Sequence, residues 1–113
     1  METNLKRKPR AFNVGIKNQI TILDCGSINL NFNEQITFTT DNGREYDVAR
    51  KCWGFYATPS INGRLKNFGF KTALTQNSFG KNYIMLVEET KITEFYKYLE
   101  EDKLKLIEWL DDR

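Results

Sequence analysis

The fold of this chain is decided by residues 35–48, which read QITFTTDNGREYDV. Polar and apolar residues alternate on both sides of the turn at residues 41–43, as they do in two strands joined by a tight connection. A two-residue loop would set Phe38 opposite Asp47, whereas a three-residue loop ending in a left-handed glycine pairs Phe38 with Tyr46. Because only the second register keeps apolar residues on one face, we predict the three-residue loop, with Phe38 in the core.

Upstream of this hairpin the sequence also alternates. Residues 27–32 carry apolar side chains at every second position, so Ile28, Leu30 and Phe32 are predicted to share one buried face. Residues 12–25 are rich in β-forming residues and supply further strands.

Downstream, a second hairpin is predicted around residues 77–80. Its strands are residues 68–75 and 83–87, and the second of these is apolar on both faces, which is typical of a covered central strand. Residues 12–57 and 68–88 together predict a curved antiparallel sheet or partial barrel.

Two helical segments complete the predicted fold. Thr58 and Pro59 are typical of a helix start, and apolar residues recur at helical spacing up to residue 68, which predicts a short inserted helix over 59–67. Residues 90–111 have a helical period, so a helical C-terminus is expected to pack on the sheet, either as one helix or as two helices divided at the acidic residues 100–102. The fold class predicted is therefore α+β.

The chain has the size and composition of one globular domain. It has 113 residues, 40% apolar and 28% charged, with no repeat or linker, so residues 12–113 are predicted to form a single α+β domain. Residues 1–11 are basic and lack the apolar segment of a secretory signal. We expect a flexible tail there, the alternative being a basic arm that extends an anion-binding surface.

Compartment and membrane association are constrained by composition. No apolar run approaches the roughly 20 residues that span a bilayer, so no membrane partner is expected. Cys25 and Cys52 are too few and too far apart for a disulfide scaffold or a zinc site. We therefore expect two buried thiols in a cytoplasmic protein.

Charge is distributed unevenly along the chain. Residues 48–87 contain no Asp or Glu but six Lys and Arg, whereas residues 88–113 hold nine acids and five bases. The same basic block contains seven aromatic residues, namely Trp53, Phe55, Tyr56, Phe68, Phe70, Phe79 and Tyr83. Positive charge beside flat apolar rings is typical of proteins that hold an anionic ligand or partner.

Within this block, residues 50–66 are the predicted site. They join a strand to a helix start, where unpaired backbone N–H groups and the helix dipole favour an anion. Arginine can grip a phosphate with two parallel hydrogen bonds, and an aromatic ring can stack on a base or sugar. The candidate ligand-binding residues are Arg50, Lys51, Trp53, Tyr56, Thr58, Ser60, Asn62, Arg64, Lys66 and Lys71.

Each candidate also has an ordinary structural interpretation. Trp53 and Phe55 are of the type that fills cores, Ser60 could merely start a helix, and Arg64 could lie on a solvated surface. The missing acids favour the anion site, because ordinary surfaces mix both signs of charge.

Nothing in the sequence favours catalysis. Histidine is absent, which removes the commonest general base and metal ligand. Cys52 follows two cations but has no visible base partner. Asp24, Asp41, Glu45 and Asp47 could form a carboxylate pair across strands. Asp41, however, already has a role in the turn, and Glu45 and Asp47 are expected on an exposed strand face. We predict no catalytic residue, metal ion or cofactor.

Two functions fit these features. The first is a small non-catalytic binding domain for an anionic ligand, either a nucleotide-type small molecule or single-stranded nucleic acid. The second is a protein-interaction module, an accessory or inhibitory subunit that docks on an acidic protein partner, as a monomer or a homodimer. Only nucleic-acid binding predicts an affinity that falls steeply with salt.

Overall fold

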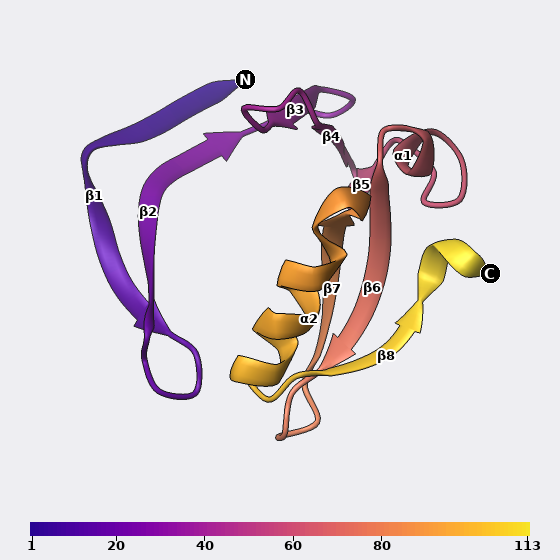
Figure 1. The fold of residues 1–113 in the computed structure, drawn as a ribbon. Coiled ribbons are helices and arrows are strands. Elements are labelled where there is room, and N and C mark those ends of the chain that lie inside the picture. Colours follow the sequence, from indigo (N-terminus) through magenta and orange to yellow (C-terminus); the bar gives the residue numbers. More distant parts are fainter. The chain divides into compact units, whose positions relative to one another are not determined.

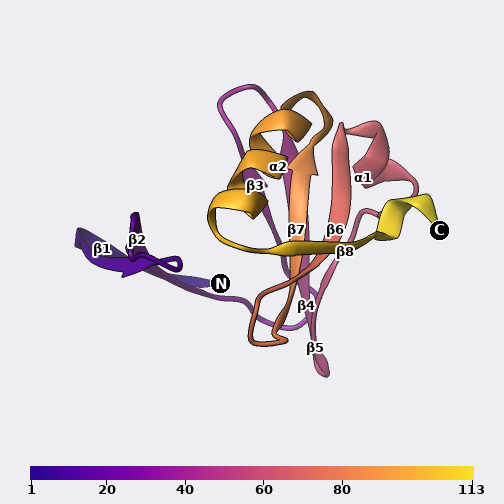
Figure 2. The same cartoon turned by 60° about the horizontal axis from the view of Figure 1, so that its bottom comes forward.

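The computed structural model describes the whole chain, residues 1–113, which divides into two compact units. Unit 1 comprises Met1–Ile36 and Val48–Tyr56, and unit 2 comprises Thr37–Asp47 and Ala57–Arg113. Figure 1 follows the elements of both units along the chain, and Figure 2 turns the same ribbon. The single domain expected over residues 12–113 stays a prediction, since compact units of this kind can belong to one domain.

Unit 1 contains a long two-stranded ribbon. Strand β1 (Glu2–Val14) pairs antiparallel with β2 (Ile20–Asn29). The register is interrupted between Leu5 and Arg10, where β1 bulges outward. A flexible tail is predicted over residues 1–11. The structure has residues 2–11 in β1, and residues 2–5, 10 and 11 lie opposite residues of β2.

Gly26 permits the close approach of the two strands. Its φ is +127°, and a Cβ there would lie 2.1 Å from the carbonyl oxygen of Asn4, so only glycine fits without a shift of the backbone. The N–H of Gly26 donates to Asp24 Oδ1 at 3.1 Å. This hydrogen bond, followed by that from Lys6, lowers the pKa of the Asp24 carboxyl.

The buried face predicted for residues 27–32 is only partly present. Leu30 is buried, but Ile28 and Phe32 are 37% and 59% exposed. The chain leaves β2 at Asn29 and turns, and the N–H of Asn33 then donates to the carbonyl oxygen of Arg50 at 2.7 Å. The alternation therefore does not continue in one strand up to residue 32.

A second sheet has three strands with β4 in the middle: β3 (Gln35–Thr39), β4 (Glu45–Lys51) and β5 (Gly54–Ala57). The predicted three-residue loop is confirmed, since the N–H of Thr40 donates to the carbonyl oxygen of Arg44 at 3.1 Å and Gly43 has a φ of +84°. The prediction that Phe38 lies in the core is wrong, because its side chain is 52% exposed.

Unit 2 contains a three-stranded antiparallel sheet with a helix on one face (Figures 1 and 2). The strand order is β7-β6-β8, and the elements are α1 (Arg64–Asn67), β6 (Phe70–Gln76), β7 (Asn82–Glu88), α2 (Ile92–Glu101) and β8 (Lys105–Trp109). The predicted second hairpin is confirmed, with Phe70 opposite Glu88. However, β7 is an edge strand and not the covered central strand predicted, and Tyr83 and Ile84 are 45% and 60% exposed.

The helix predicted over residues 90–111 is correct only in its first half. A short 3₁₀ turn (Glu89–Lys91) leads into α2, which ends where Lys103 adopts a left-handed φ of +52°. The N–H of Leu104 returns to the carbonyl oxygen of Leu99 at 2.8 Å, a standard helix-ending arrangement. The chain then forms β8, which pairs with β6, and a final 3₁₀ turn (Leu110–Asp112).

The core of unit 2 draws on the sheet and on both helices, with Leu65, Phe70, Ala73, Thr75, Val87 and Leu99 buried. Phe95 of α2 packs against Trp109 of β8, their ring centroids 5.7 Å apart. Over the whole chain 51% of the residues are in strands and 18% in helices. The α+β prediction is therefore confirmed.

Candidate functional site

The structure distributes the ten predicted site residues between the two units. Arg50, Lys51, Trp53 and Tyr56 belong to unit 1. The other six belong to unit 2, namely Thr58, Ser60, Asn62, Arg64, Lys66 and Lys71. The surroundings of each group decide which of its polar atoms are available to a ligand.

The helix start predicted at Thr58 and Pro59 is wrong. Helix α1 has only four residues and no side-chain cap. The N–H of Thr58 donates to the carbonyl oxygen of Asp47 at 3.1 Å, and that of Leu65 donates to the carbonyl oxygen of Ser60 at 3.0 Å. These backbone donors are used within the chain, because the segment between β5 and α1 forms turns instead of a helical first turn.

Arg64, the central cation of the predicted site, is held by a buried carboxylate. Its Nη1 lies 3.2 Å from Asp47 Oδ2, and its Nη2 lies 3.5 Å from Thr58 Oγ1. Asp47 also accepts a 2.6 Å hydrogen bond from the hydroxyl of Thr37. The guanidinium therefore satisfies a buried charge of the fold and is not free to grip a ligand.

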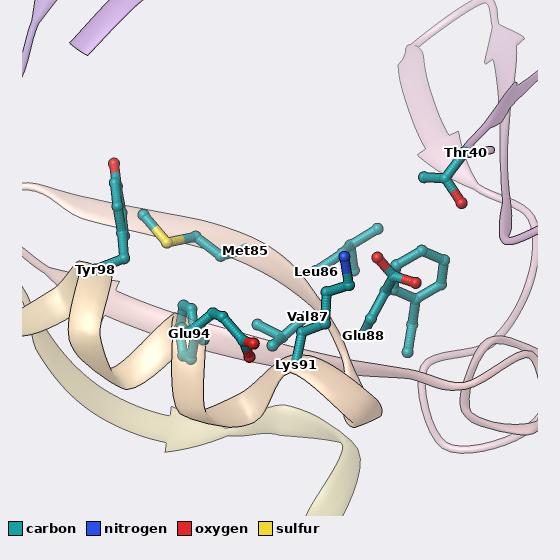
Figure 3. Close-up of a pocket in the computed structure, with 10 residues that line it drawn as sticks. Thr40, Met85, Leu86, Val87, Glu88, Lys91, Glu94 and Tyr98 are labelled. Carbon is teal, nitrogen blue, oxygen red and sulfur yellow. The ribbon is translucent and has the colours of Figure 1, made fainter. Parts of the chain in front are cut away.

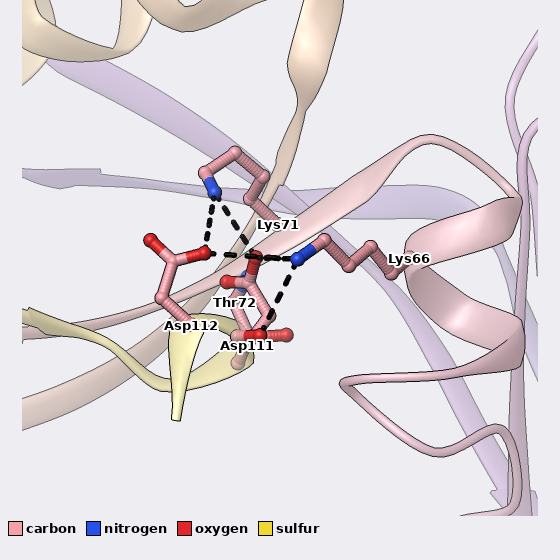
Figure 4. A network of polar contacts seen from close by, with 5 residues as sticks. All are labelled: Lys66, Lys71, Thr72, Asp111 and Asp112. Atoms are coloured by element: carbon pink, nitrogen blue, oxygen red, sulfur yellow. Dashed lines mark hydrogen bonds and ion pairs between the residues drawn. The ribbon is translucent and has the colours of Figure 1, made fainter.

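Lys66 and Lys71 are likewise engaged, in a network that joins the start of β6 to the end of the chain (Figure 4). Lys71 Nζ lies 3.0 Å from Asp111 Oδ2 and 3.5 Å from Asp112 Oδ1, and Lys66 Nζ lies 3.7 Å from the same Asp112 oxygen. The Asp111 side chain is fully buried and accepts a 2.8 Å hydrogen bond from the N–H of Thr72.

The contacts within this network shift the pKa values of Asp111 and Lys71 in the directions that keep both groups charged. Burial alone would raise the pKa of the Asp111 carboxyl, but the hydrogen bonds from the Thr72 N–H and from Lys71 outweigh it and lower this pKa. Burial likewise opposes the charge on Lys71, yet the hydrogen bond and the charge of Asp111 raise the pKa of the ammonium. The network is a structural ion pair, so its lysines do not present an open anion site.

A second ionic cluster, centred on Arg44, was not found from the sequence. Its Nε lies 3.3 Å from Glu88 Oε1, and its Nη1 donates to the carbonyl oxygen of Phe68 at 2.6 Å. Asn42 Nδ2 lies 2.6 Å from the same Glu88 oxygen, and this hydrogen bond is the main cause that lowers the pKa of Glu88. A Cβ at Gly69 would lie 2.0 Å from Arg44 Nη1, so glycine makes room for the guanidinium.

Unit 1 presents a different surface, formed by the short connection from β4 to β5. Trp53, Phe55 and Tyr56 are 67%, 64% and 44% exposed. The rings of Trp53 and Tyr56 have centroids 5.9 Å apart with a tilt of 32° between their planes. Because neighbouring strand residues point to opposite faces, Phe55 lies on the side away from Tyr56. The core placement considered for Trp53 and Phe55 is therefore wrong.

Two cations accompany these rings without a carboxylate partner. Arg50 donates to the carbonyl oxygen of Leu30 at 2.6 Å and lies over the ring of Phe32, 4.8 Å from its centroid. Lys51 donates to the amide oxygen of Asn33 at 2.6 Å. Since both partners are neutral, the two positive charges remain uncompensated at close range. We call these two residues together with Phe32, Trp53 and Tyr56 the basic aromatic surface.

Unit 1 as a whole is more positively charged than unit 2. Unit 1 holds seven Lys and Arg against three Asp and Glu, whereas unit 2 holds ten against twelve. The bulge of β1 adds Arg7 and Lys8, both exposed, to the positive side of this balance. Unit 1 is therefore the basic part of the molecule. Only two of its cations, Arg50 and Lys51, belong to the acid-free block of residues 48–87.

Unit 2 also contains an open groove of about 450 Å³ between β7 and α2 (Figure 3). Apolar side chains and a few charged or hydroxyl groups line it, among them Met85, Val87, Lys91, Glu94, Phe95 and Tyr98. Burial, and then the charge of Asp102, raise the pKa of the Tyr98 hydroxyl, so this group stays protonated at neutral pH. The groove contains no thiol, and its lining suits apolar binding better than acid–base chemistry.

The cysteines and carboxylates form no reactive cluster. Cys25 and Cys52 are both free and exposed, so the prediction of buried thiols is wrong. No group of three His, Cys, Asp or Glu side chains lies close enough together to hold a metal ion. None of the helices combines the length and apolar character that crossing a membrane requires.

Comparison of the chain with models of protein families, with curated proteins and with solved structures finds no match.

Proposed function

We propose that this chain is a non-catalytic binding domain for single-stranded nucleic acid, and that the basic aromatic surface of unit 1 is its contact site. The observation that carries the proposal is the exposure of Trp53 and Tyr56, which closely follow Arg50 and Lys51 in the chain, two cations that have no acidic partner. Exposed rings in one segment with cations that no carboxylate neutralises are the combination with which proteins bind single strands, by stacking on bases and neutralising phosphates.

Exposure of these rings argues for an unpaired strand as the ligand. Burying an aromatic ring is favourable, and a ring left in water is therefore available to stack on a base. Bases in a duplex already stack on each other, whereas a single strand offers free base faces. Trp53 lies in the short turn between two strands, a position from which a ring can reach between splayed bases.

The other basic residues of the predicted site are assigned a structural role in this proposal. Arg64, Lys66 and Lys71 each lie within 4 Å of a carboxylate of unit 2. Their replacement should lower stability before it changes affinity. Arg50 and Lys51 carry the electrostatic part of binding, with Arg7 and Lys8 as further cations of the same unit.

The test is a titration of labelled oligothymidine, single-stranded RNA and a duplex of the same length with the wild type and four variants. Trp53→Ala should weaken single-strand binding by about 1–3 kcal/mol, the usual value for one base–ring stack. Phe79→Ala is the matched control, because Phe79 is 84% exposed but lies in unit 2. It should leave the affinity unchanged.

The charge contribution is tested with a second matched pair. Lys51→Ala should reduce the slope of log affinity against log salt by about 0.7, the value for one phosphate contact on a single strand. Lys97→Ala, which removes a lysine of α2 in unit 2, should not change this slope. If the wild type binds none of the ligands, or if Trp53→Ala and Phe79→Ala lose affinity equally, the proposal fails.

A further inference from the structure

The free edge of β7 is apolar along most of its length. Strand β7 pairs with β6 on one side only, because the order of the sheet is β7-β6-β8. Its seven residues read NYIMLVE and include no Lys, Arg or Pro, and its pairing with β6 has no bulge. Exposed edges are normally protected against pairing by such features. This edge therefore lacks the usual protection.

The hydrogen-bond pattern shows which backbone groups of β7 face outward. In the loop of the hairpin the N–H of Asn77 donates to the carbonyl oxygen of Lys81, and at its other end the N–H of Glu89 donates to that of Gly69. Residues that bond to a neighbouring antiparallel strand alternate with residues that do not. Between Lys81 and Glu89 the bonded positions are therefore 83, 85 and 87. The N–H and C=O groups of Asn82, Ile84, Leu86 and Glu88 accordingly point away from β6.

From this geometry we propose that β7 pairs with β7 of a second copy of the chain, antiparallel and about a two-fold axis at Met85. This register sets Ile84 opposite Leu86 of the other copy and Asn82 opposite Glu88. The backbone groups of Ile84 and Leu86 make no other hydrogen bond, so each of these pairs can exchange two. The carbonyl oxygen of Glu88 begins the 3₁₀ turn of residues 89–91, so the pair with Asn82 uses the N–H of Glu88 as donor. Met85 lies opposite its own counterpart at a position that makes no hydrogen bond.

The second copy is favoured over another partner because the strand is complementary to itself. In the proposed register Tyr83 lies opposite Val87, so every apolar residue meets an apolar one. The only charged residue, Glu88, lies opposite an amide and is already compensated by Arg44 at 3.3 Å. The two-fold arrangement therefore brings no like charges together, and it joins the two sheets of three strands into one of six.

Sedimentation of the full chain over a wide concentration range gives the first test, with a dimer expected. Ile84→Pro should abolish this dimer, since proline removes an outward N–H without breaking a bond to β6. Ile84→Val keeps the N–H and should remain dimeric. Circular dichroism of each variant establishes that the fold is retained.

Disulfide trapping gives a second test that does not depend on a disruptive variant. In a background of Cys25→Ser and Cys52→Ser, Met85→Cys would bring two thiols together across the axis, with the Cα atoms about 4.5 Å apart, a spacing that a disulfide spans. Ile84→Cys and Tyr83→Cys place the thiol opposite a different residue and are the controls. Oxidised glutathione should cross-link Met85→Cys at least tenfold faster than either. A wild type that stays monomeric at all concentrations, or equal cross-linking of the three variants, overturns the proposal.

Discussion

Replacement of Asp111 by asparagine tests whether the network at the chain end holds unit 2 together. The Asp111 side chain is fully buried and faces Lys71 Nζ at 3.0 Å, while the Lys71 side chain is only 24% exposed. Asp111→Asn keeps the size of the side chain and an oxygen that can accept the N–H of Thr72. It removes only the negative charge, so the partly buried ammonium of Lys71 loses its nearer carboxylate and keeps only the exposed Asp112.

The expected loss in the free energy of unfolding follows from that geometry. Removing one partner of a buried ion pair costs about 3–5 kcal/mol. Because the amide retains the hydrogen bond to Thr72, we expect about 2–4 kcal/mol for Asp111→Asn, slightly less than the full range. Asp112→Asn is the matched control, since Asp112 lies 3.5 Å from the same ammonium but its side chain is 56% exposed. It should cost less than about 1 kcal/mol.

The pKa shifts of Asp111 and Lys71 predict how the stabilisation by this ion pair changes with pH. The pKa of Asp111 is lowered in the folded state from its ordinary value of 3.8. Its contribution to stability is therefore complete above that value and is lost as the pH falls through the lower pKa of the folded protein. The pKa of Lys71 is raised above 10.5, so its contribution is lost only at higher pH. The difference between wild type and Asp111→Asn should be constant near neutrality and shrink in acid.

Urea denaturation of the wild type and both variants, at neutral pH and in acid, measures these differences. The reasoning is refuted if Asp112→Asn is as destabilising as Asp111→Asn at neutral pH. It is equally refuted if the Asp111→Asn difference does not shrink in acid.

Two further substitutions should stabilise the protein. Lys103→Gly should raise the free energy of unfolding by about 1 kcal/mol, because a left-handed φ is strained for lysine and not for glycine, and an unchanged urea midpoint would contradict this. Thr72→Val should raise it by about 1 kcal/mol as well, since the buried Thr72 hydroxyl has no hydrogen-bond partner and an apolar group of the same shape avoids that cost. Thermal unfolding of Thr72→Val, with Thr93→Val on the exposed part of α2 as the control, would reveal a fall in midpoint if the hydroxyl were needed.

Local features of this fold were predictable from the sequence. The loop at residues 41–43 and the loop at residues 77–80 were both identified, because turn residues act on their immediate neighbours. The strands on either side of each loop and the first half of the C-terminal helix followed from periodicity. The acidic residues 100–102 indicated a break in the helix, but a second helix was expected beyond it, and the left-handed position there is taken by a lysine and not by the usual glycine.

Strand β8 shows how tertiary pairing overrode a local pattern. Residues 105–109 lie within a stretch of helical period, yet Leu106 lies opposite Thr75 of β6. The gain from completing a sheet depends on a strand some thirty positions earlier in the chain, and no window of neighbouring residues contains that information. The same limit explains why β7 was expected in the middle of the sheet instead of at its edge.

The candidate site, too, could be predicted from the sequence only in part. The sequence by itself determined that a basic, aromatic block exists without acids of its own, and that it includes Arg50, Lys51 and Trp53. Only the tertiary structure decided which cations of the block stay uncompensated, because it brings Asp47 to Arg64 across 17 positions and Asp111 to Lys71 across 40. The physical reason is that Coulomb energy and burial depend on distances in space, so charges far apart in the chain neutralise each other once it has folded.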